Sequence, residues 1–189
     1  MKKVILSACV VFGMALAVTS QGIHYVGEKW GGGIVFYVYN DSSGVHGLVA
    51  ATEDQSKSVI WFPRVGGKDF ITDVAGDAYG KGAGNTNLLM DMQRVEGITG
   101  NFAAKVCADY TVTVGGVTYD DWFLPSIREL ELLQMKRIVV GGFDNVLYWS
   151  STEYDSDEAW MKQFGDDDNG GRAIYKYKME TRVRAVRAF

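Results

Sequence analysis

The sequence predicts one domain in which α-helices combine with mostly antiparallel β-strands. Short runs rich in aromatic and β-branched residues, bounded by glycine, asparagine or aspartate, predict the strands. Apolar residues that recur three or four positions apart predict the helices. Pro125 marks the point where an extended run gives way to a helix, so it orders the two kinds of element along the chain.

Segment 119–133 contains that junction. Pro125 disfavours a helical conformation at the preceding residue, so the extended run 121–124 should end there and a helix should follow. Ser126 is the expected N-cap, because its hydroxyl can accept the Glu129 N–H while the Glu129 carboxylate accepts the Ser126 N–H. Three apolar residues give this helix one buried face: Ile127, Leu130 and Leu133.

Strand-forming runs lie on both sides of the junction. Residues 34–39 and 47–51 should form a β-hairpin across the turn at 40–44. Residues 52–83 hold many turn formers and should make a long irregular excursion, pinned by the aromatic residues Trp61, Phe62, Phe70 and Tyr79. Residues 112–117 contain a turn at Gly115-Gly116. Further strands are expected at 147–153, 159–164, 173–177 and 182–189, and the last two should have one face in water.

Two more helices are expected before the junction. Asn85 or Thr86 should cap the first, which should end at Gly97, and Asn101 should cap the second. The second helix carries an apolar stripe formed by Phe102, Val106 and Tyr110. Cys107 lies beside this stripe, so we interpret it as a buried, inert thiol.

Residues 1–20 have the layout of a secretory signal peptide. Lys2 and Lys3 precede an apolar run at 4–18, which is too short for an ordinary membrane span, and small residues follow at the expected cleavage sites after Ala17 or Ser20. Residues 6–9 (LSAC) are similar to a bacterial lipobox, but the apolar stretch between Lys3 and Cys9 is too short for one. We therefore expect residues 21–189 to be exported as a single domain to the periplasm, the medium or the cell surface.

The composition of this mature chain excludes several classes of function. Its net charge is −6, because loss of Lys2 and Lys3 changes the overall −4, and this acidity argues against a dedicated nucleic-acid binder. Cys107 is its single cysteine, so no intrachain disulfide can form. The chain has two histidines, His24 and His46, which together with one cysteine are too few ligands for a typical zinc site. We expect no cofactor.

Several spaced motifs then identify a resemblance. They are GGIVFY at 32–37, DQS at 54–56, DWFLPS at 121–126 with Glu129-Leu130, YWSSTE at 148–153 and VRAVR at 183–187. In this order they resemble the domain family at the C-terminus of the legionella collagen-like adhesin, over residues 25–189. More distantly, the chain is similar to the C-type-lectin-like group, which includes sulfatase-modifying enzymes and hypervariable binding proteins.

The resemblance implies an α+β, C-type-lectin-like fold, with two helices beside a small twisted sheet and a loop-rich second half. It also implies surface binding of sulfated or other glycans on host cells. Because fold alone does not define function, an alternative stays open: a structural or assembly module of the cell envelope without a soluble ligand.

The acidic turn at 166–170 (DDDNG) invites a calcium interpretation. The EF-hand pattern fails, because the twelfth position from Asp166 is Tyr177, where a bidentate glutamate is needed. The calcium-dependent sugar motifs of C-type lectins are also absent. A plain hairpin turn is the other interpretation, and we assign no metal ligand.

The second half contains the candidate ligand contacts. Six basic residues follow the acidic turn, namely Arg172, Lys176, Lys178, Arg182, Arg184 and Arg187. They could face the acidic run 153–168, or the strand could present a row of donors to an anionic glycan or a surface protein. Arg184 and Arg187 fall within the family motif and should be structural. Tyr154 and Trp160 lie in an exposed loop, so the predicted ligand-binding set is Tyr154, Trp160, Arg172, Lys176 and Lys178.

Catalysis is the weakest reading of the sequence. Glu153 with Asp155, or Asp120 with Asp121, could be offered as glycosidase carboxylates, but sequence alone does not fix their separation. The sulfatase-modifying relatives use paired cysteines, and the mature chain has one. We therefore predict a binding or adhesion domain that is not an enzyme, with a hydrolase as the remote alternative.

Overall fold

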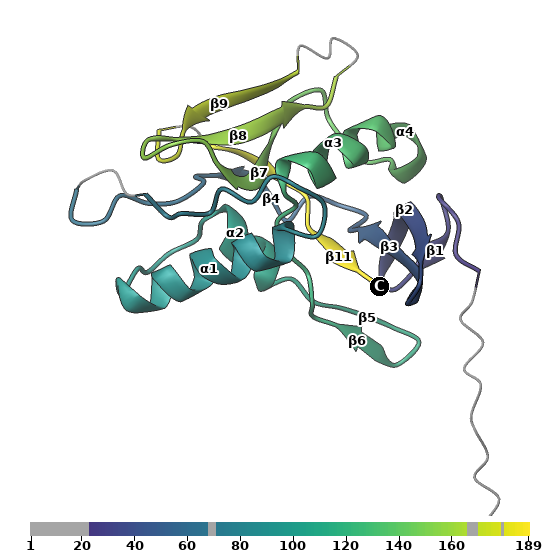
Figure 1. Cartoon of the computed structure of the whole chain (residues 1–189). Coiled ribbons are helices and arrows are strands. Elements are labelled where there is room, and N and C mark those ends of the chain that lie inside the picture. The colour runs from purple at the N-terminus through teal and green to yellow at the C-terminus, as the bar shows by residue number, and fades with distance from the viewer. Residues whose placement is uncertain (1–22, 68–70, 166–169, 179) are drawn as a thin grey trace, which may run out of the picture.

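The computed structural model describes residues 23–67, 71–165, 170–178 and 180–189 (Figure 1). The predicted leader with Cys9, Phe70 and the acidic residues 166–169 lie outside these ranges. The helices are α1 (Gly82–Val95), α2 (Ala103–Ala108), α3 (Ile127–Met135) and α4 (Arg137–Val140). The strands are β1 (Lys29–Trp30), β2 (Gly33–Asp41), β3 (Gly44–Ala50), β4 (Ser56–Val59), β5 (Val112–Val114), β6 (Val117–Tyr119), β7 (Leu147–Glu153), β8 (Glu158–Gln163), β9 (Gly171–Tyr175), β10 (Thr181–Val183) and β11 (Val186–Ala188).

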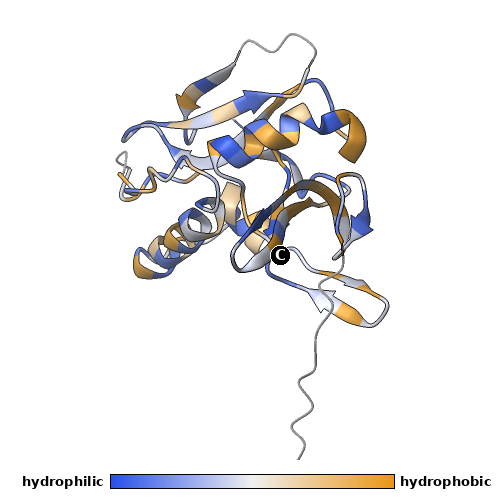
Figure 2. Cartoon of the chain, turned by 45° about the vertical axis from the view of Figure 1, so that its right-hand side comes forward, coloured by the Kyte–Doolittle hydropathy of each residue, from blue (hydrophilic) through white to orange (hydrophobic). Residues whose placement is uncertain are grey.

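Within the described residues the strands form three sheets. One has the order β1-β2-β3-β11, the second β4-β10-β7-β8-β9, and β5 with β6 makes a separate ribbon. Figure 2 shows the four-stranded sheet as a curled arch, much of it hydrophobic, while the five-stranded sheet lies across α3. Most pairings are antiparallel, but β10 runs parallel to β7.

The predicted α+β, C-type-lectin-like fold is wrong. Strand accounts for 34% of the chain and helix for 21%, and one of the several sheets is curled into a half-barrel. The physical reason lies in pairings between distant segments: β10 inserts between β4 and β7, and β11 completes the sheet begun by β2 and β3. Local periodicity indicates that a run is a strand, but it does not select the partner.

The first predicted hairpin is confirmed. β2 and β3 pair antiparallel from Ile34 opposite Ala50 to Asp41 opposite Gly44, with a register shift between Val35 and Tyr37. The shift adds one residue to β2, so the side chains beyond it change faces. Tyr37 and Tyr39 both lie beyond the shift and are two residues apart, so they share one face near the end of the hairpin.

The proline junction is also confirmed. The Ser126 hydroxyl accepts the Glu129 N–H at 3.3 Å, and the Glu129 carboxylate accepts the Ser126 N–H at 2.8 Å, which completes the capping box. Before the cap, Trp122 packs in one hydrophobic core and Phe123 in a second. The junction therefore links the core under α1 and α2 to the core between α3 and the curled sheet.

Replacing Ser126 with alanine should lower the free energy of unfolding by about 1 kcal/mol, because the N-cap bond is lost. The same hydroxyl also donates to the Ala78 carbonyl at 2.9 Å, so the loop before α1 loses a partner too. Urea denaturation of Ser126→Ala measures the loss, and Ser42→Ala in an exposed turn is the control. Equal stability of the two variants would contradict the capping role.

The caps expected for the first two helices are wrong. The N-cap of α2 is Phe102 and not Asn101, and no side chain caps this helix. α1 begins at Gly82, ahead of Asn85 and Thr86, and no side chain caps it. Asn85 instead donates to the Gly76 carbonyl at 2.7 Å, and the Thr86 hydroxyl accepts the Leu124 N–H at 3.0 Å. Both residues are buried, so tertiary partners outside the helix use the groups that a cap would have used.

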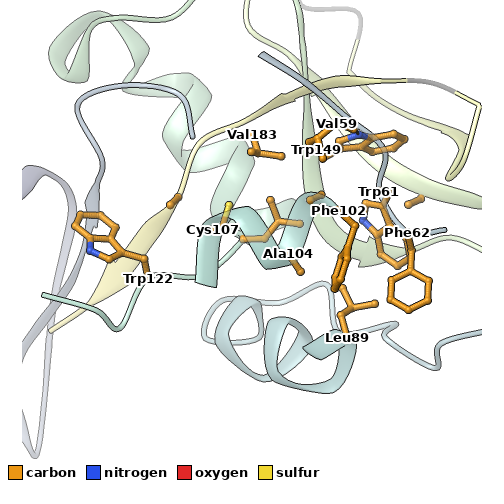
Figure 3. Packing of buried hydrophobic residues seen from close by; sticks show 14 of the residues in the cluster. Val59, Trp61, Phe62, Leu89, Phe102, Ala104, Cys107, Trp122, Trp149 and Val183 are labelled. Carbon is orange, nitrogen blue, oxygen red and sulfur yellow. Dashed lines mark hydrogen bonds between the residues drawn. The ribbon is translucent and has the colours of Figure 1, made fainter. Parts of the chain in front are cut away.

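The larger core contains the aromatic residues of the irregular segment (Figure 3). Trp61 and Phe62 are buried there, and Phe62 meets Phe102 edge to face with ring centroids 5.1 Å apart. The predicted pinning is thus confirmed for these two residues, whereas Tyr79 is exposed. Cys107 is buried in the same core, and burial raises the pKa of its thiol, as expected for an inert cysteine.

The run at 182–189 forms two strands, β10 and β11, and most of its residues are buried, so the water-facing side that its alternation predicted is wrong. β9 does expose Arg172 and Tyr175. Arg184 is fully buried, where it donates from Nε to Asp54 Oδ1 at 2.8 Å and stacks over the Phe143 ring. Arg182 and the Tyr148 hydroxyl donate to the other Asp54 oxygen at 2.8 and 3.0 Å. The expected structural role of Arg184 is therefore confirmed, through a buried network centred on one carboxylate.

This network should weaken the fold at high pH. Burial, together with the charge of Asp54, raises the pKa of the Tyr148 phenol to about 12. In the unfolded chain tyrosine loses its proton near pH 10, so between about pH 10 and 12 only the unfolded state gains by deprotonation, and stability falls. Urea denaturation at about pH 9 and about pH 11 should show a smaller fall for Tyr148→Phe than for the natural chain. Equal falls would contradict this assignment.

Candidate functional site

The hairpin of β8 and β9 brings part of the predicted ligand-binding set together. Trp160 lies opposite Ala173, and Tyr175 lies opposite Glu158, so Trp160 and Tyr175 share a face of the sheet. Tyr154 follows β7 and meets Trp160 edge to face, with ring centroids 5.1 Å apart and planes at 90°. The two aromatic residues predicted as ligand contacts are therefore neighbours on one face.

A basic residue and a further ring extend this face. The ammonium of Lys178 lies 4.4 Å from the centroid of the Tyr175 ring and 5.6 Å from that of Tyr177. The guanidinium of Arg64, from the irregular segment, also stacks over the Tyr177 ring, 4.1 Å from its centroid. We call Tyr154, Trp160, Tyr175, Tyr177 and Lys178 the hairpin surface. Sequence reasoning missed Tyr177 and Arg64, although the alternation of Tyr175 and Tyr177 around a lysine was a signal for the first.

Lys176 does not belong to this surface, because its side chain is buried. Its ammonium pairs with the Glu153 carboxylate and donates to the carbonyls of Asp155 and Ser156 at 2.6 and 2.9 Å. The chain leaves β9 at Tyr175, so the two-residue period that placed Lys176 beside Arg172 and Lys178 no longer applies there. Lys176 instead fixes the turn between β7 and β8, which carries Tyr154.

Arg172 is exposed but lies on the opposite face of the hairpin from Trp160. It faces Met161 across the strands, and Met161 belongs to the larger core. Because β9 is an edge strand, the Arg172 side chain reaches water beyond the rim of that core. The predicted row of basic donors therefore does not form: Arg172 lies on one face, Lys178 lies beside the Tyr175 ring on the other, and Lys176 is buried.

The turn beside Tyr154 is acidic and internally bonded. Asp155 Oδ1 accepts the N–H groups of Asp157 and Glu158, both at 2.8 Å. Glu153 is buried and also accepts the N–H and the hydroxyl of Thr72 at 2.8 and 2.9 Å. The surface thus has an acidic end at the β7–β8 turn and a basic end at Lys178.

Of the other two carboxylates singled out from the sequence, Asp120 and Asp121, the second is an ion-pair partner. Asp121 accepts two hydrogen bonds from the Arg187 guanidinium, at 2.6 and 2.9 Å, so the structural role expected for Arg187 is confirmed. In the part of the chain that the structure describes, no three His, Cys, Asp or Glu side chains are grouped so that they could hold a metal ion. The acidic turn at 166–169 lies outside that part.

Comparisons with known proteins give one informative similarity. No protein-family model matches the sequence, and no curated protein does. Among solved structures, the chain is similar to the crystal structure of a fimbrial protein from Bacteroides ovatus ATCC 8483, with 18% sequence identity and a TM-score of 0.53. The similarity covers 82% of this chain and 43% of the fimbrial protein, so this chain spans less than half of that protein's length.

At this level of identity the similarity shows a shared fold. It agrees with the correction made above, since the neighbour is a fimbrial protein and not a C-type lectin. The resemblance to the collagen-like adhesin domain stays a prediction, because the comparisons do not bear on it. None of the helices within the described ranges has the length and apolar character that crossing a membrane requires.

Proposed function

We propose that this chain is a module of a cell-surface structure of the fimbrial kind and that it acts by contact with a partner, without catalysis. The observation that supports this most is the similarity of fold to a fimbrial protein over 82% of the chain. The predicted export signal agrees with such a location. Both functions expected from the sequence, adhesion and assembly, fall within this proposal.

We further infer that the hairpin surface is where the contact is made and that the partner carries acidic groups. Tyr154 is 55% exposed and Tyr175 43%, so their rings are available to a partner. Tyrosine and tryptophan are favoured at protein contacts because they bury much area at little cost in conformational entropy. The exposed cations Lys178 and Arg64, which lie over the Tyr175 and Tyr177 rings, would attract sulfate or carboxylate groups. Arg172, on the opposite face of the hairpin, is not part of this contact.

Location is tested in the cells that produce the chain. Antibodies raised against the purified protein should label intact cells, and protease added outside should remove the label. Labelling that needs permeabilised cells would contradict the surface assignment. Cells from which the gene has been deleted should show no label, which controls for binding of the antibody to other surface proteins.

The acidic partner is tested on immobilised heparin. The double variant Arg64→Ala with Lys178→Ala should elute at lower salt than the natural chain, because it removes the two cations that lie over the Tyr175 and Tyr177 rings. Lys57→Ala with Lys136→Ala is the matched control, because it removes the same charge from exposed lysines elsewhere. Equal shifts for both double variants would show a net-charge effect only and would overturn the assignment to this hairpin, as would flow-through of the natural chain at low salt.

A further inference from the structure

A second aromatic site lies on the curled sheet, away from the hairpin surface. Four rings follow one another there: Tyr79, Tyr37, Tyr39 and His46. Successive ring centroids are 5.6, 5.7 and 5.3 Å apart, and successive planes are inclined by 15°, 32° and 33°. The rings therefore form a row of similarly oriented faces rather than a closed box.

The row lines a hollow of about 450 Å³. Phe189 and Leu48 complete its apolar wall, and its volume falls within the usual range for small-molecule sites. Gly47 makes the close packing here possible, because a side chain at this position would collide with the Phe189 ring and the Tyr37 carbonyl. Tyr39 and Tyr79 are 46% and 50% exposed, so the row is open to solvent.

Both ends of the row are held in place by hydrogen bonds, one end to α3 and the other within the β2–β3 hairpin. The loop with Tyr79 is tied to the α3 capping box, because Ser126 donates to the Ala78 carbonyl at 2.9 Å and the Gly80 N–H donates to Glu129 at 2.8 Å. At the other end, His46 Nε2 lies 2.8 Å from the Ser43 hydroxyl. A ligand would therefore meet rings that are already oriented, which lowers the entropy cost of binding.

We propose that this row binds a ring of an uncharged saccharide. The C–H groups on the face of a sugar ring carry partial positive charge, and they stack on the negative face of an aromatic ring. Three phenol hydroxyls and one imidazole surround the row and can exchange hydrogen bonds with sugar hydroxyls. Among the described residues that line the hollow none is Lys, Arg, Asp or Glu, and the nearby Asp41 carboxylate lies 3.3 Å from His46 Nε2, so an uncharged ligand fits it better than an anion.

Two other ligand classes fit the geometry less well. A quaternary ammonium group is bound by rings that surround it, whereas these rings share similar orientations. A proline-rich peptide can dock on aromatic rows, but its prolines lack N–H donors, so the phenols would meet carbonyl acceptors alone. The mixed donors and acceptors of the row match sugar hydroxyls more completely.

Isothermal titration calorimetry of the full chain with hexasaccharides of glucose, mannose and N-acetylglucosamine tests the proposal. At least one of them should bind, and Tyr79→Ala should weaken that binding by about tenfold, as expected for the loss of one stacking ring. Tyr79→Phe should retain most of the stacking. Tyr25→Ala, another exposed tyrosine, is the control and should bind like the natural chain.

Several results would overturn this assignment. They are an absence of heat with all three saccharides, binding that Tyr79→Ala leaves unchanged, and binding of a proline decapeptide in place of the sugars. If Tyr79→Ala proves unstable, Tyr39→Ala, at the exposed end of β2, provides the same test. The inference does not rest on the proposed function, because Tyr79→Ala leaves Arg64 and Lys178 in place and the heparin test can fail or succeed separately.

Discussion

Lys176→Met should lower the free energy of unfolding by about 3–5 kcal/mol, because it leaves the buried Glu153 carboxylate without its cation. The lost ammonium also satisfies the carbonyls of Asp155 and Ser156, which hold the turn after β7. Methionine has similar length, so packing changes little and the loss reports mainly on charge. Guanidinium denaturation at neutral pH measures it.

The neighbouring lysine provides the control for this prediction. Lys178→Met removes the same charge from an exposed position and should change the stability by no more than about 0.5 kcal/mol. In the Lys176→Met background, Glu153→Gln should recover part of the loss, because it removes the unpaired charge but keeps an oxygen for Thr72. If Lys176→Met had the same free energy of unfolding as the natural chain, the burial of this ion pair would be contradicted.

A comparable loss, about 3–5 kcal/mol, is expected for Arg184→Met. The guanidinium donates to Asp54 and to the carbonyls of Ala51 and Gly142, at 3.0 and 2.5 Å for the two carbonyls. Removing it takes this buried donor from Asp54 Oδ1 and from the two carbonyls, while Arg182 and Tyr148 still bond the other Asp54 oxygen. Arg184→Lys should recover little, because one ammonium cannot reproduce the planar fork that meets a carboxylate and several carbonyls together.

Arg182→Met tests whether the large loss of stability expected for Arg184→Met depends on the burial of Arg184. Arg182 bonds the same carboxylate but lies nearer the surface, where it also pairs with Asp144. Water can replace its bonds, so its loss should be clearly smaller than that of Arg184→Met. Thermal unfolding of the two variants side by side gives the comparison, and a larger loss for Arg182→Met would contradict the network described above.

Local chemistry explains which elements the sequence could predict. The capping box needs only Ser126 and Glu129 at a fixed spacing after Pro125, and the first hairpin needs only two strand-forming runs around a turn. The aromatic character of Trp61 and Phe62 was enough to predict that they anchor an irregular segment. In each case the interacting residues are close in sequence, or the prediction required only burial.

The sequence predicted only those contacts of the candidate site that join residues close together in the chain. Tyr154 and Trp160 lie on either side of one short turn, so their proximity followed from the sequence. Lys176 was misplaced because its side chain follows the end of β9, and the row on the curled sheet was missed because Tyr79 joins it from a distant loop. A pattern within a short window of sequence cannot predict a contact between residues that are far apart in the chain.

By itself, therefore, the sequence determined most of the strand-forming runs, the proline junction, the capped helix and the apolar residues that must be buried. It did not show β4, which lies in the segment expected to be irregular, or the division of the last run into β10 and β11. The tertiary structure decided how β10 and β11 are inserted, which basic side chains are enclosed, and which aromatic rings come together. The physical reason is that propensity and capping act over a few residues, whereas strand partners and buried ion pairs depend on contacts between segments far apart in the chain.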